Sequence, residues 1–407
     1  MRRLLGFLFL LFHLILITAL VIFLAVQGLR SGHLHATKWY PPLLTSTACA
    51  AILSSVWQWL ADINTSKAFK AAFWVSPLLT CAIALLLLTI GSSVSLGAGM
   101  AALLCSVVLS LYGCWASPRF DYAIRVLKIS NSASPPPKAT SLVLLSMLVS
   151  FLYSCLLVIG IGGARALGTK FEALFISIIL LSLAWTMQVM RNTMMASITR
   201  VKYMYLVCGI DVDAHVALRD TLWHLMGRDT DEFLFSCANC YAGVASTLVM
   251  YGNRWGFVYV GVYNRGFVQA SMDAWSVFRR TELEMLIDSD LMGSFCFLSG
   301  VAVGAICSLV SGSWALAVHK SYATELSLYA FFIGYFMVIR NWKLKTSLSS
   351  AACNSDLEFV LLQSRIAMAW QQASLTAYYV AYAENPQNSR FDSTIPSRIQ
   401  ELRRVQA

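Results

Sequence analysis

The sequence opens with the stretch Met1–Arg30, MRRLLGFLFLLFHLILITALVIFLAVQGLR, in which the run from Leu4 to Val26 is predominantly apolar. A helix that crosses a bilayer needs roughly 20 apolar residues, so this run is long enough to span. It is also longer than the apolar core of a signal peptide, which has roughly 7–15 residues. We therefore expect a first membrane helix, with Arg2 and Arg3 on the cytoplasmic side.

The rest of the chain has the same character. Of its 407 residues, 58% are hydrophobic and 12% are charged, whereas ordinary soluble domains carry roughly 25% charged residues. Because only a helix satisfies all its backbone groups within one segment in lipid, we predict an all-α, polytopic membrane bundle. The expected spans are about 4–27, 42–61, 72–91, 96–115, 140–163, 171–190, 233–250, 289–317 and 324–340.

Lysine and arginine in short loops indicate which side of the membrane a loop occupies. They are frequent in 116–139, in 251–286 and after the span 324–340, so these segments are expected in the cytoplasm, together with both termini. The segment 207–232 is acidic instead, which favours the external side.

These assignments require an even number of crossings between residues 164 and 229. One is 171–190, and the second must then use 192–210, which carries Arg200 and Lys202. Each charge would cost about 2.5–3.5 kcal/mol at the bilayer centre. The segment would have to be shielded by other helices, face water, or be re-entrant. Counting it gives a prediction of about ten crossings.

The composition and motifs argue against several classes of protein. The net charge of +10 lies in short loops and tails, which indicates membrane orientation rather than nucleic-acid binding. None of the six histidines has metal-ligand spacing, and Cys237-Ala-Asn-Cys240 has no second cysteine pair. There is no GxSxG motif and no nucleotide-binding loop. We therefore expect no enzyme, no metal and no cofactor.

We expect two parts in the chain. Residues 1–345 form the predicted transmembrane domain, which includes the segment 251–286, and residues 346–407 form a cytoplasmic C-terminal segment. Residues 341–375 are amphipathic rather than spanning, because glutamines and an arginine interrupt them.

Residues 181–197, LSLAWTMQVMRNTMMAS, carry the best candidates for substrate binding. Trp185, Gln188 and Asn192 are spaced three and four apart, so they share one face of a helix. An aromatic ring beside hydrogen-bonding amides suits a quaternary ammonium, which is held by cation–π attraction. The alternative is that the amides only join neighbouring helices.

The predicted span 233–250 adds two polar candidates. Tyr241 could join an aromatic cage, and Asn239 lies two residues before it. Packing in the core of the bundle is the alternative for both residues.

The stretch YGNRWGFVYVGVYNRGFVQASMDAWSVFRR, residues 251–280, contains an apolar run too short to span, from Trp255 to Tyr263. Aromatic residues alternate with valines in this run, which favours a strand. An unpaired strand at a membrane is unfavourable, so we predict helices with a break at 264–266. The second helix would bury an apolar face of Phe267, Ala270, Ala274 and Phe278.

Four stretches, in this order along the chain, resemble patterns of the choline transporter-like family. They are LYGCWASPRFDYA (111–123), WTMQVMRNT (185–193), the motif within 253–275, and YVAYAENPQNSRFDSTIP (379–396). The third stretch resembles the family's N-R-x-A-Y-V…F-C…S-A pattern, at Asn253, Arg254, Phe267, Ser271, Asp273 and Trp275. Gly256-Phe257 stands where the family has Ala-Tyr, which indicates a divergent member.

The resemblance implies a transporter of choline or a related organic cation, such as ethanolamine, in the plasma membrane. We expect alternating access without ATP hydrolysis, and a structural or gating role for the motif of 253–275. Two alternatives stay open: transport of another solute or lipid on the same fold, and a non-transporting membrane scaffold. The expected partners are a quaternary amine and the lipid bilayer, and the sequence does not indicate the oligomeric state.

Overall fold

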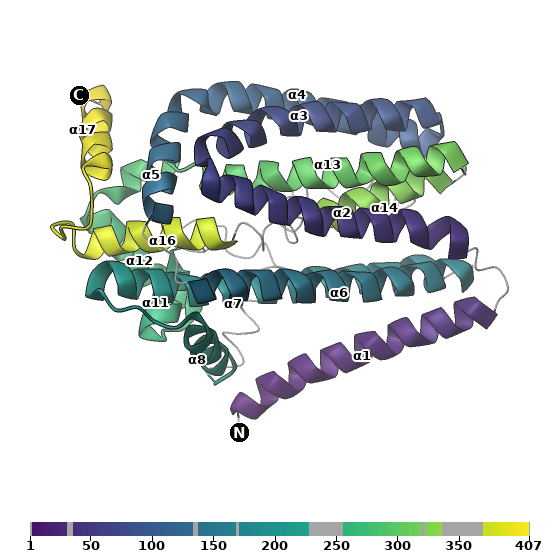
Figure 1. The fold of residues 1–407 in the computed structure, drawn as a ribbon, viewed down its shortest axis with the longest axis horizontal. Coiled ribbons are helices and arrows are strands. Elements are labelled where there is room, and N and C mark those ends of the chain that lie inside the picture. Colours follow the sequence, from purple (N-terminus) through teal and green to yellow (C-terminus); the bar gives the residue numbers. More distant parts are fainter. Residues whose placement is uncertain are drawn as a thin grey trace, which may run out of the picture.

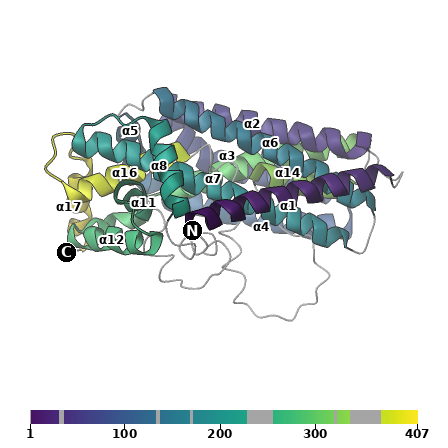
Figure 2. The same cartoon turned by 90° about the horizontal axis from the view of Figure 1, so that it is seen from below.

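The computed structural model of the chain describes residues 2–30, 36–132, 137–167, 171–227, 255–318, 322–335 and 369–406. All regular structure in these ranges is helical, which confirms the predicted all-α class. The helices form an elongated bundle with a group of short helices at one end (Figure 1). A view turned by 90° shows the same grouping (Figure 2).

Among the described residues, seven helices are long and apolar enough to cross a membrane. They are α1 (Arg2–Arg30), α2 (Ala36–Ile63), α3 (Thr65–Ile90), α4 (Ser93–Ala116), α6 (Pro137–Leu167), α7 (Glu172–Cys208) and α13 (Met292–Val318). All seven match predicted spans. Of the other two predicted spans, 233–250 lies outside the described residues, and 324–340 is described to Tyr335 as α14 (Ala323–Tyr335), which packs along α13. The total of ten crossings stays a prediction.

The short helices gather at one end of the bundle, which is called the short-helix end below (Figure 1). They are α5 (Phe120–Ser132), α8 (Ala214–Gly227), α11 (Gly256–Tyr263), α12 (Phe267–Arg280), α16 (Ala369–Glu384) and α17 (Thr394–Gln406), with the 3-10 segments η1 (Ser117–Arg119) and η2 (Leu283–Ser289). Helix α1 starts beside α8, and α17 lies at the far edge of this group. Both described ends of the chain are therefore at the same end of the molecule.

The prediction of a separate crossing at 192–210 is wrong. Helix α7 runs without interruption for 37 residues, about 55 Å at 1.5 Å per residue, which is well beyond the roughly 30 Å of a bilayer's hydrocarbon core. Its second half enters the short-helix end. There Arg200 pairs with Asp220 of α8 at 3.3 Å, and Lys202 donates to the Ser130 carbonyl oxygen of α5 at 3.3 Å. The apolar residues around these charges face protein rather than lipid.

The prediction that 207–232 and 251–286 lie on opposite sides of the membrane is wrong for their described parts, 207–227 and 255–286. Helix α8 lies at the same end of the molecule as α11 and α12 (Figure 1). Asp220, the one acidic residue of α8, pairs there with Arg200 of α7 and with its neighbour Arg219. Acidic residues are weak signals of topology because they also occur as local ion-pair partners.

The predicted cytoplasmic loop 116–139 is largely a helix. The chain turns at η1, and α5 then runs across the end of the bundle (Figure 1). Helix α5 buries Tyr122, Val126 and Leu127 and exposes Arg125 and Lys128. Its amphipathic pattern explains why a charged segment forms a helix that packs against the bundle.

The break predicted at 264–266 is confirmed. Helix α11 ends at Asn264, whose φ of 53° is left-handed, and α12 begins after the extended Gly266. Asparagine tolerates this conformation better than most residues. Helix α12 buries Ala270, Ala274 and Phe278, as the apolar spacing predicts.

The predicted division of the chain near residue 345 lies outside the described residues. Helix α16, which belongs to the predicted C-terminal segment 346–407, is buried along almost its whole length. It packs against α7 and α5. The part of this segment that forms α16 is therefore integrated with the end of the bundle.

Candidate functional site

The side chain of Trp185 lies in the interior of the bundle, where α7 faces α1. Trp185 is 8% exposed, and its ring meets the imidazole of His13 edge to face, with ring centroids 4.5 Å apart and an interplanar angle of 61°. Ser182, one turn before Trp185, has its Oγ 3.0 Å from His13 Nε2. The aromatic face that the sequence singled out is therefore covered by a polar ring from another helix.

Hydroxyl groups extend this contact to α6. The Tyr153 hydroxyl lies 2.8 Å from Ser182 Oγ, and Thr186 Oγ1 donates to the Tyr153 hydroxyl at 3.2 Å. Trp185, His13, Tyr153, Ser182 and Thr186 are called the Trp185 cluster below. Helices α1, α6 and α7 supply it, and Trp185 comes from the stretch that resembles the family.

The structure brings together only part of the predicted substrate set. Trp185 is in the cluster, and Asn192 is half-buried seven residues further along the same helix. The backbone of Gln188 is helical, and its side chain lies outside what the structure describes. Asn239 and Tyr241 lie outside the described residues, so their predicted role is untested.

Sequence reasoning did not select His13, Tyr153, Ser182 or Thr186. A histidine inside an otherwise apolar span was the available signal, because polar groups at membrane depth are expensive and tend to be functional. Ser182 and Thr186 give no such signal, since serine and threonine can satisfy a hydroxyl on their own helix. Tyr153 gives none either, because a single tyrosine is ordinary in a membrane helix bundle. Only the packing of α1 and α6 on α7 places them together.

The Trp185 cluster can do a limited set of things chemically. Its indole face can attract a cation through the ring quadrupole, and its hydroxyls can bond a polar group on the same ligand. The cluster contains no carboxylate, so it suits a weakly hydrated organic cation better than a metal ion.

A second polar network lies further along α7 than the Trp185 cluster, toward the short-helix end. Arg191, 8% exposed, donates to Gln372 Oε1 of α16 at 2.7 Å. The Lys202 ammonium lies over the ring of Trp370, 4.8 Å from its centroid, and Gln371 Nε2 donates to Asp62 Oδ1 of α2 at 3.1 Å. The charged side chains of Arg191 and Lys202, in the second half of α7, are thus surrounded by polar and aromatic groups of α2, α5 and α16.

The motif residues of 253–275 lie in and around the α11–α12 hairpin. Phe267 packs on Phe257 at 5.2 Å between ring centroids, Asp273 pairs with Arg265, and Trp275 is half-buried. Buried Ser271 lies against Gly256, where a Cβ would come within 2.7 Å of Ser271 Oγ. Asn253 and Arg254 lie outside the described residues. The described motif residues therefore make contacts within the hairpin, and their structural or gating role stays a prediction.

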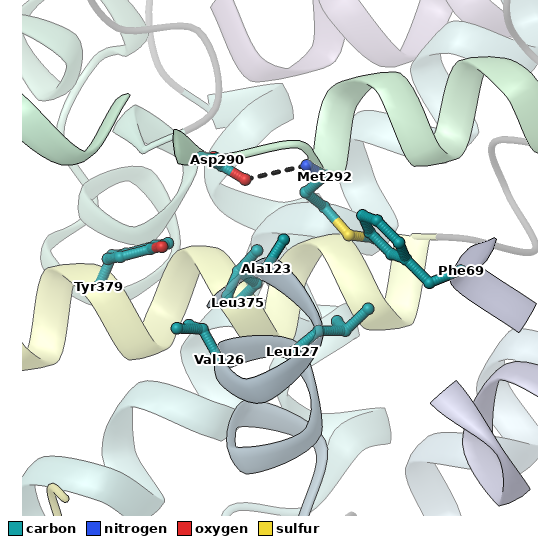
Figure 3. A pocket seen from close by; sticks show the side chains of 8 residues that line it. All are labelled: Phe69, Ala123, Val126, Leu127, Asp290, Met292, Leu375 and Tyr379. Carbon is teal, nitrogen blue, oxygen red and sulfur yellow. Dashed lines mark hydrogen bonds between the residues drawn. The ribbon is translucent and has the colours of Figure 1, made fainter. Parts of the chain in front are cut away.

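A small cavity lies where α3, α5, α16 and the start of α13 meet (Figure 3). Its volume of about 10 Å³ is close to what one water needs. It is lined by Phe69, Ala123, Val126, Leu127, Asp290, Met292, Leu375 and Tyr379, and Asp290 Oδ1 accepts from the Met292 amide at 3.0 Å. It is too small for an organic substrate. The described residues contain no group of three or more potential metal ligands.

Residues 177–344 match the family model described as "Plasma-membrane choline transporter". This match supports the prediction of a divergent member of the choline transporter-like family. The match begins inside α7 and covers Trp185 and the α11–α12 hairpin, while His13 and Tyr153 precede it. Together with the apolar helices, the match supports a multi-pass membrane protein.

Two curated relatives are distant. "Protein pns1" of Aspergillus fumigatus is 22% identical over 113 residues, which cover 28% of this chain and 21% of that protein. "Protein PNS1" of Cryptococcus neoformans is 21% identical over 109 residues, or 25% of this chain and 20% of that protein. The match thus spans about a fifth of the length of these relatives. It supports the family predicted from four short stretches, and it transfers no residue role.

Proposed function

We propose that the protein transports choline or a related organic cation across a membrane by alternating access, without ATP hydrolysis. The observation that carries this proposal is the Trp185 cluster, an aromatic and hydroxyl-lined contact inside a bundle of a choline transporter-like protein. The ammonium group would lie against the Trp185 ring, and the hydroxyls of Tyr153 and Thr186 would meet the polar end of the substrate.

The arrangement of α1 supports a closed conformation of this site. His13 covers the Trp185 ring, and α1 is fastened to α6 near its other end, where Gly28 and Gly163 meet. Outward movement of the first half of α1 about this close crossing would uncover the ring. Alternating access in transporters commonly proceeds by rocking or gating of one part of the bundle against another, and α1 would be the moving part here.

We place the short-helix end in the cytoplasm and the protein in the plasma membrane. Arginine and lysine on α5, α12 and α17 collect at this end of the described structure, and positive loops remain on the cytoplasmic side. The plasma membrane is taken from the family description.

The experiment is uptake of radiolabelled choline into transporter-deficient cells that express the chain. Trp185→Ala removes the ring, and a desolvated cation–π contact is worth about 2 kcal/mol, so we expect uptake efficiency to fall about 10- to 30-fold. Trp185→Phe keeps an aromatic face and should retain more activity. The matched control is Trp59→Ala on α2, because Trp59 is 63% exposed on the outside of the bundle.

Two outcomes favour the alternatives. Flux that competes with a different solute or a lipid, and not with choline or ethanolamine, indicates another substrate on the same fold. No cation flux in liposomes that contain well-folded protein indicates a scaffold. If the Trp185→Ala variant reaches the membrane and takes up choline as well as the wild type does, Trp185 is not part of the site.

A further inference from the structure

A carboxylate at the short-helix end is surrounded by tyrosines. Glu384 is the last residue of α16, at the junction with α7 and α11. It accepts hydrogen bonds from the hydroxyls of Tyr203 on α7 and Tyr263 on α11, the latter at 3.2 Å. The two hydroxyls also lie 2.8 Å from each other. Two helices therefore place aromatic groups around one acidic side chain of a third helix.

A third tyrosine faces the same carboxylate. Tyr259 is 6% exposed, and its ring centroid lies 5.4 Å from that of Tyr263. Its buried hydroxyl makes no hydrogen bond of normal geometry within the described residues. Burial, and then the nearby Glu384, raise the pKa of this phenol. Tyr259 thus adds a third phenol whose hydroxyl lies close to the Glu384 carboxylate.

The helix ends around Glu384 add negative potential. Helices α7, α11 and α16 all end in this region, and none has a basic residue in its last turn. The C-terminus of a helix carries about half a negative charge, and natural helices usually compensate it with lysine or arginine. Arg390 caps the end of α7, whereas at the end of α16 the Glu384 carboxylate adds negative charge, so the local field there favours a cation.

The basic residues nearby are engaged elsewhere. Arg200 pairs with Asp220, and Arg265 pairs with Asp273. Arg390 donates to the Tyr205 carbonyl oxygen and so caps α7. Within the described part of the chain, Glu384 thus has tyrosine hydroxyls as partners and makes no ion pair.

We propose that Tyr203, Tyr259, Tyr263 and Glu384 form a second site for an organic ammonium cation, at the short-helix end. The proposal takes its ligand class from the proposed function. Ring centroids 5.4 and 6.1 Å apart leave no space for a methylated ammonium between the tyrosines. The cation therefore lies on the outer face of Tyr263, which is 46% exposed, within reach of Glu384. A divalent metal would require more oxygen ligands than one carboxylate and phenols supply.

This site is separate from the Trp185 cluster. Tyr203 and Trp185 are 18 residues apart on the uninterrupted α7, which corresponds to about 27 Å. Tyr259 and Tyr263 bring α11 into the site, and α11 forms the hairpin that carries the family-like motif. The motif segment thus gains a role: it positions a cation site where the substrate would enter or leave the bundle.

The test is binding of radiolabelled tetramethylammonium to the purified full-length protein that carries Trp185→Ala, which removes the membrane-embedded site. Tyr263→Leu removes the aromatic face, and we expect affinity to fall at least 10-fold. Tyr263→Phe keeps the face and loses the hydroxyl, and affinity should stay within about 3-fold. Glu384→Gln removes the charge and should also weaken binding at least 10-fold. The matched control is Tyr205→Leu, a partly exposed tyrosine on the same end of α7.

Two results overturn the site. Binding that is unchanged by both Tyr263→Leu and Glu384→Gln shows that the cation does not bind there. Equal loss in Tyr263→Phe and Tyr263→Leu shows that the hydroxyl bonds hold the helices together and the ring face does not bind. If Glu384→Gln does not fold, the comparison of Tyr263→Phe with Tyr263→Leu tests the site by itself. If the protein transports choline but shows no tetramethylammonium binding in the Trp185→Ala background, the second site is disproved and the proposed function stands. If tetramethylammonium binds in that background but the protein transports no choline, the proposed function is disproved and the second site stands.

Discussion

At the scale of single residues, a missing side chain sets how closely α1 approaches α6. A Cβ at Gly163 would lie 2.5 Å from the carbonyl oxygen of Leu24, and one at Gly28 would lie 3.0 Å from Gly163 Cα. Backbone atoms cannot move aside without separating the helices. We expect Gly163→Ala to destabilise the protein by about 1–3 kcal/mol, measured by thermal unfolding in detergent.

The control for this prediction is Gly97→Ala on α4. An added Cβ at Gly97 meets nothing within 4 Å. Alanine is also the better helix former by about 1 kcal/mol, so this variant should be neutral or slightly stabilised. Equal unfolding temperatures for both variants would contradict a close α1–α6 crossing.

At the scale of elements, the α11–α12 hairpin depends on the backbone of Asn264. Its φ of 53° is left-handed, which costs roughly 1–2 kcal/mol for a residue with an ordinary side chain. We expect Asn264→Val to destabilise the protein by about that amount, whereas Asn264→Gly should be neutral. Unfolding temperatures of the two variants measure the difference, and a harmless valine would show that the break has another cause.

Helix α16 gives a pH-dependent prediction. The Tyr378 hydroxyl is buried and donates to Asp392 Oδ1 at 3.0 Å. Burial, followed by the Asp392 charge, raises the pKa of Tyr378 above its ordinary value. The unfolded chain loses this proton near pH 10, while the folded chain keeps it. The stabilising contribution is therefore complete below about pH 10 and is lost as pH rises further.

Tyr378→Phe removes this titration. The variant should lose about 1 kcal/mol at neutral pH, because one hydrogen bond is missing. Its unfolding temperature should then fall less steeply than that of the wild type between pH 9 and 11. Parallel curves for the two proteins would assign the alkaline loss to other groups.

At the scale of the whole molecule, the two ends of the bundle differ in charge, and this predicts sidedness. Arg404 on α17 is exposed at the basic short-helix end, and Ser93 starts α4 at the opposite end (Figure 1). In a background without native cysteines, an impermeant maleimide should label Ser93→Cys on intact cells. It should label Arg404→Cys only after permeabilisation. The opposite pattern would invert the proposed orientation.

Much of the fold was predictable from local patterns. Apolar run length placed all seven described candidate spans, because a helix in lipid must be long enough to cross and satisfies its backbone alone. The break at Asn264 was also predictable, since a local pattern of asparagine, arginine and glycine ends a helix. Charge counting failed at 207–232 and 192–210, where the charged residues have protein partners such as Asp220 for Arg200.

Some residues of the candidate sites were likewise predictable from the sequence, and others were not. Trp185 could be selected because its neighbours at helical spacing form a recognisable face. His13, Tyr153 and Glu384 could not, since each acquires its neighbours from a different helix, 29 residues away for Tyr153, 169 for His13 and 181 for Glu384.

Composition and helical spacing therefore establish a multi-pass helical protein, its family-like stretches and one aromatic residue of interest. These properties depend on interactions within a segment or between a segment and lipid. Only the tertiary structure shows that α7 leaves the bundle as one helix, that His13 covers Trp185, and that three helix ends surround Glu384. Those arrangements depend on which helices pack together, and local sequence does not encode that choice.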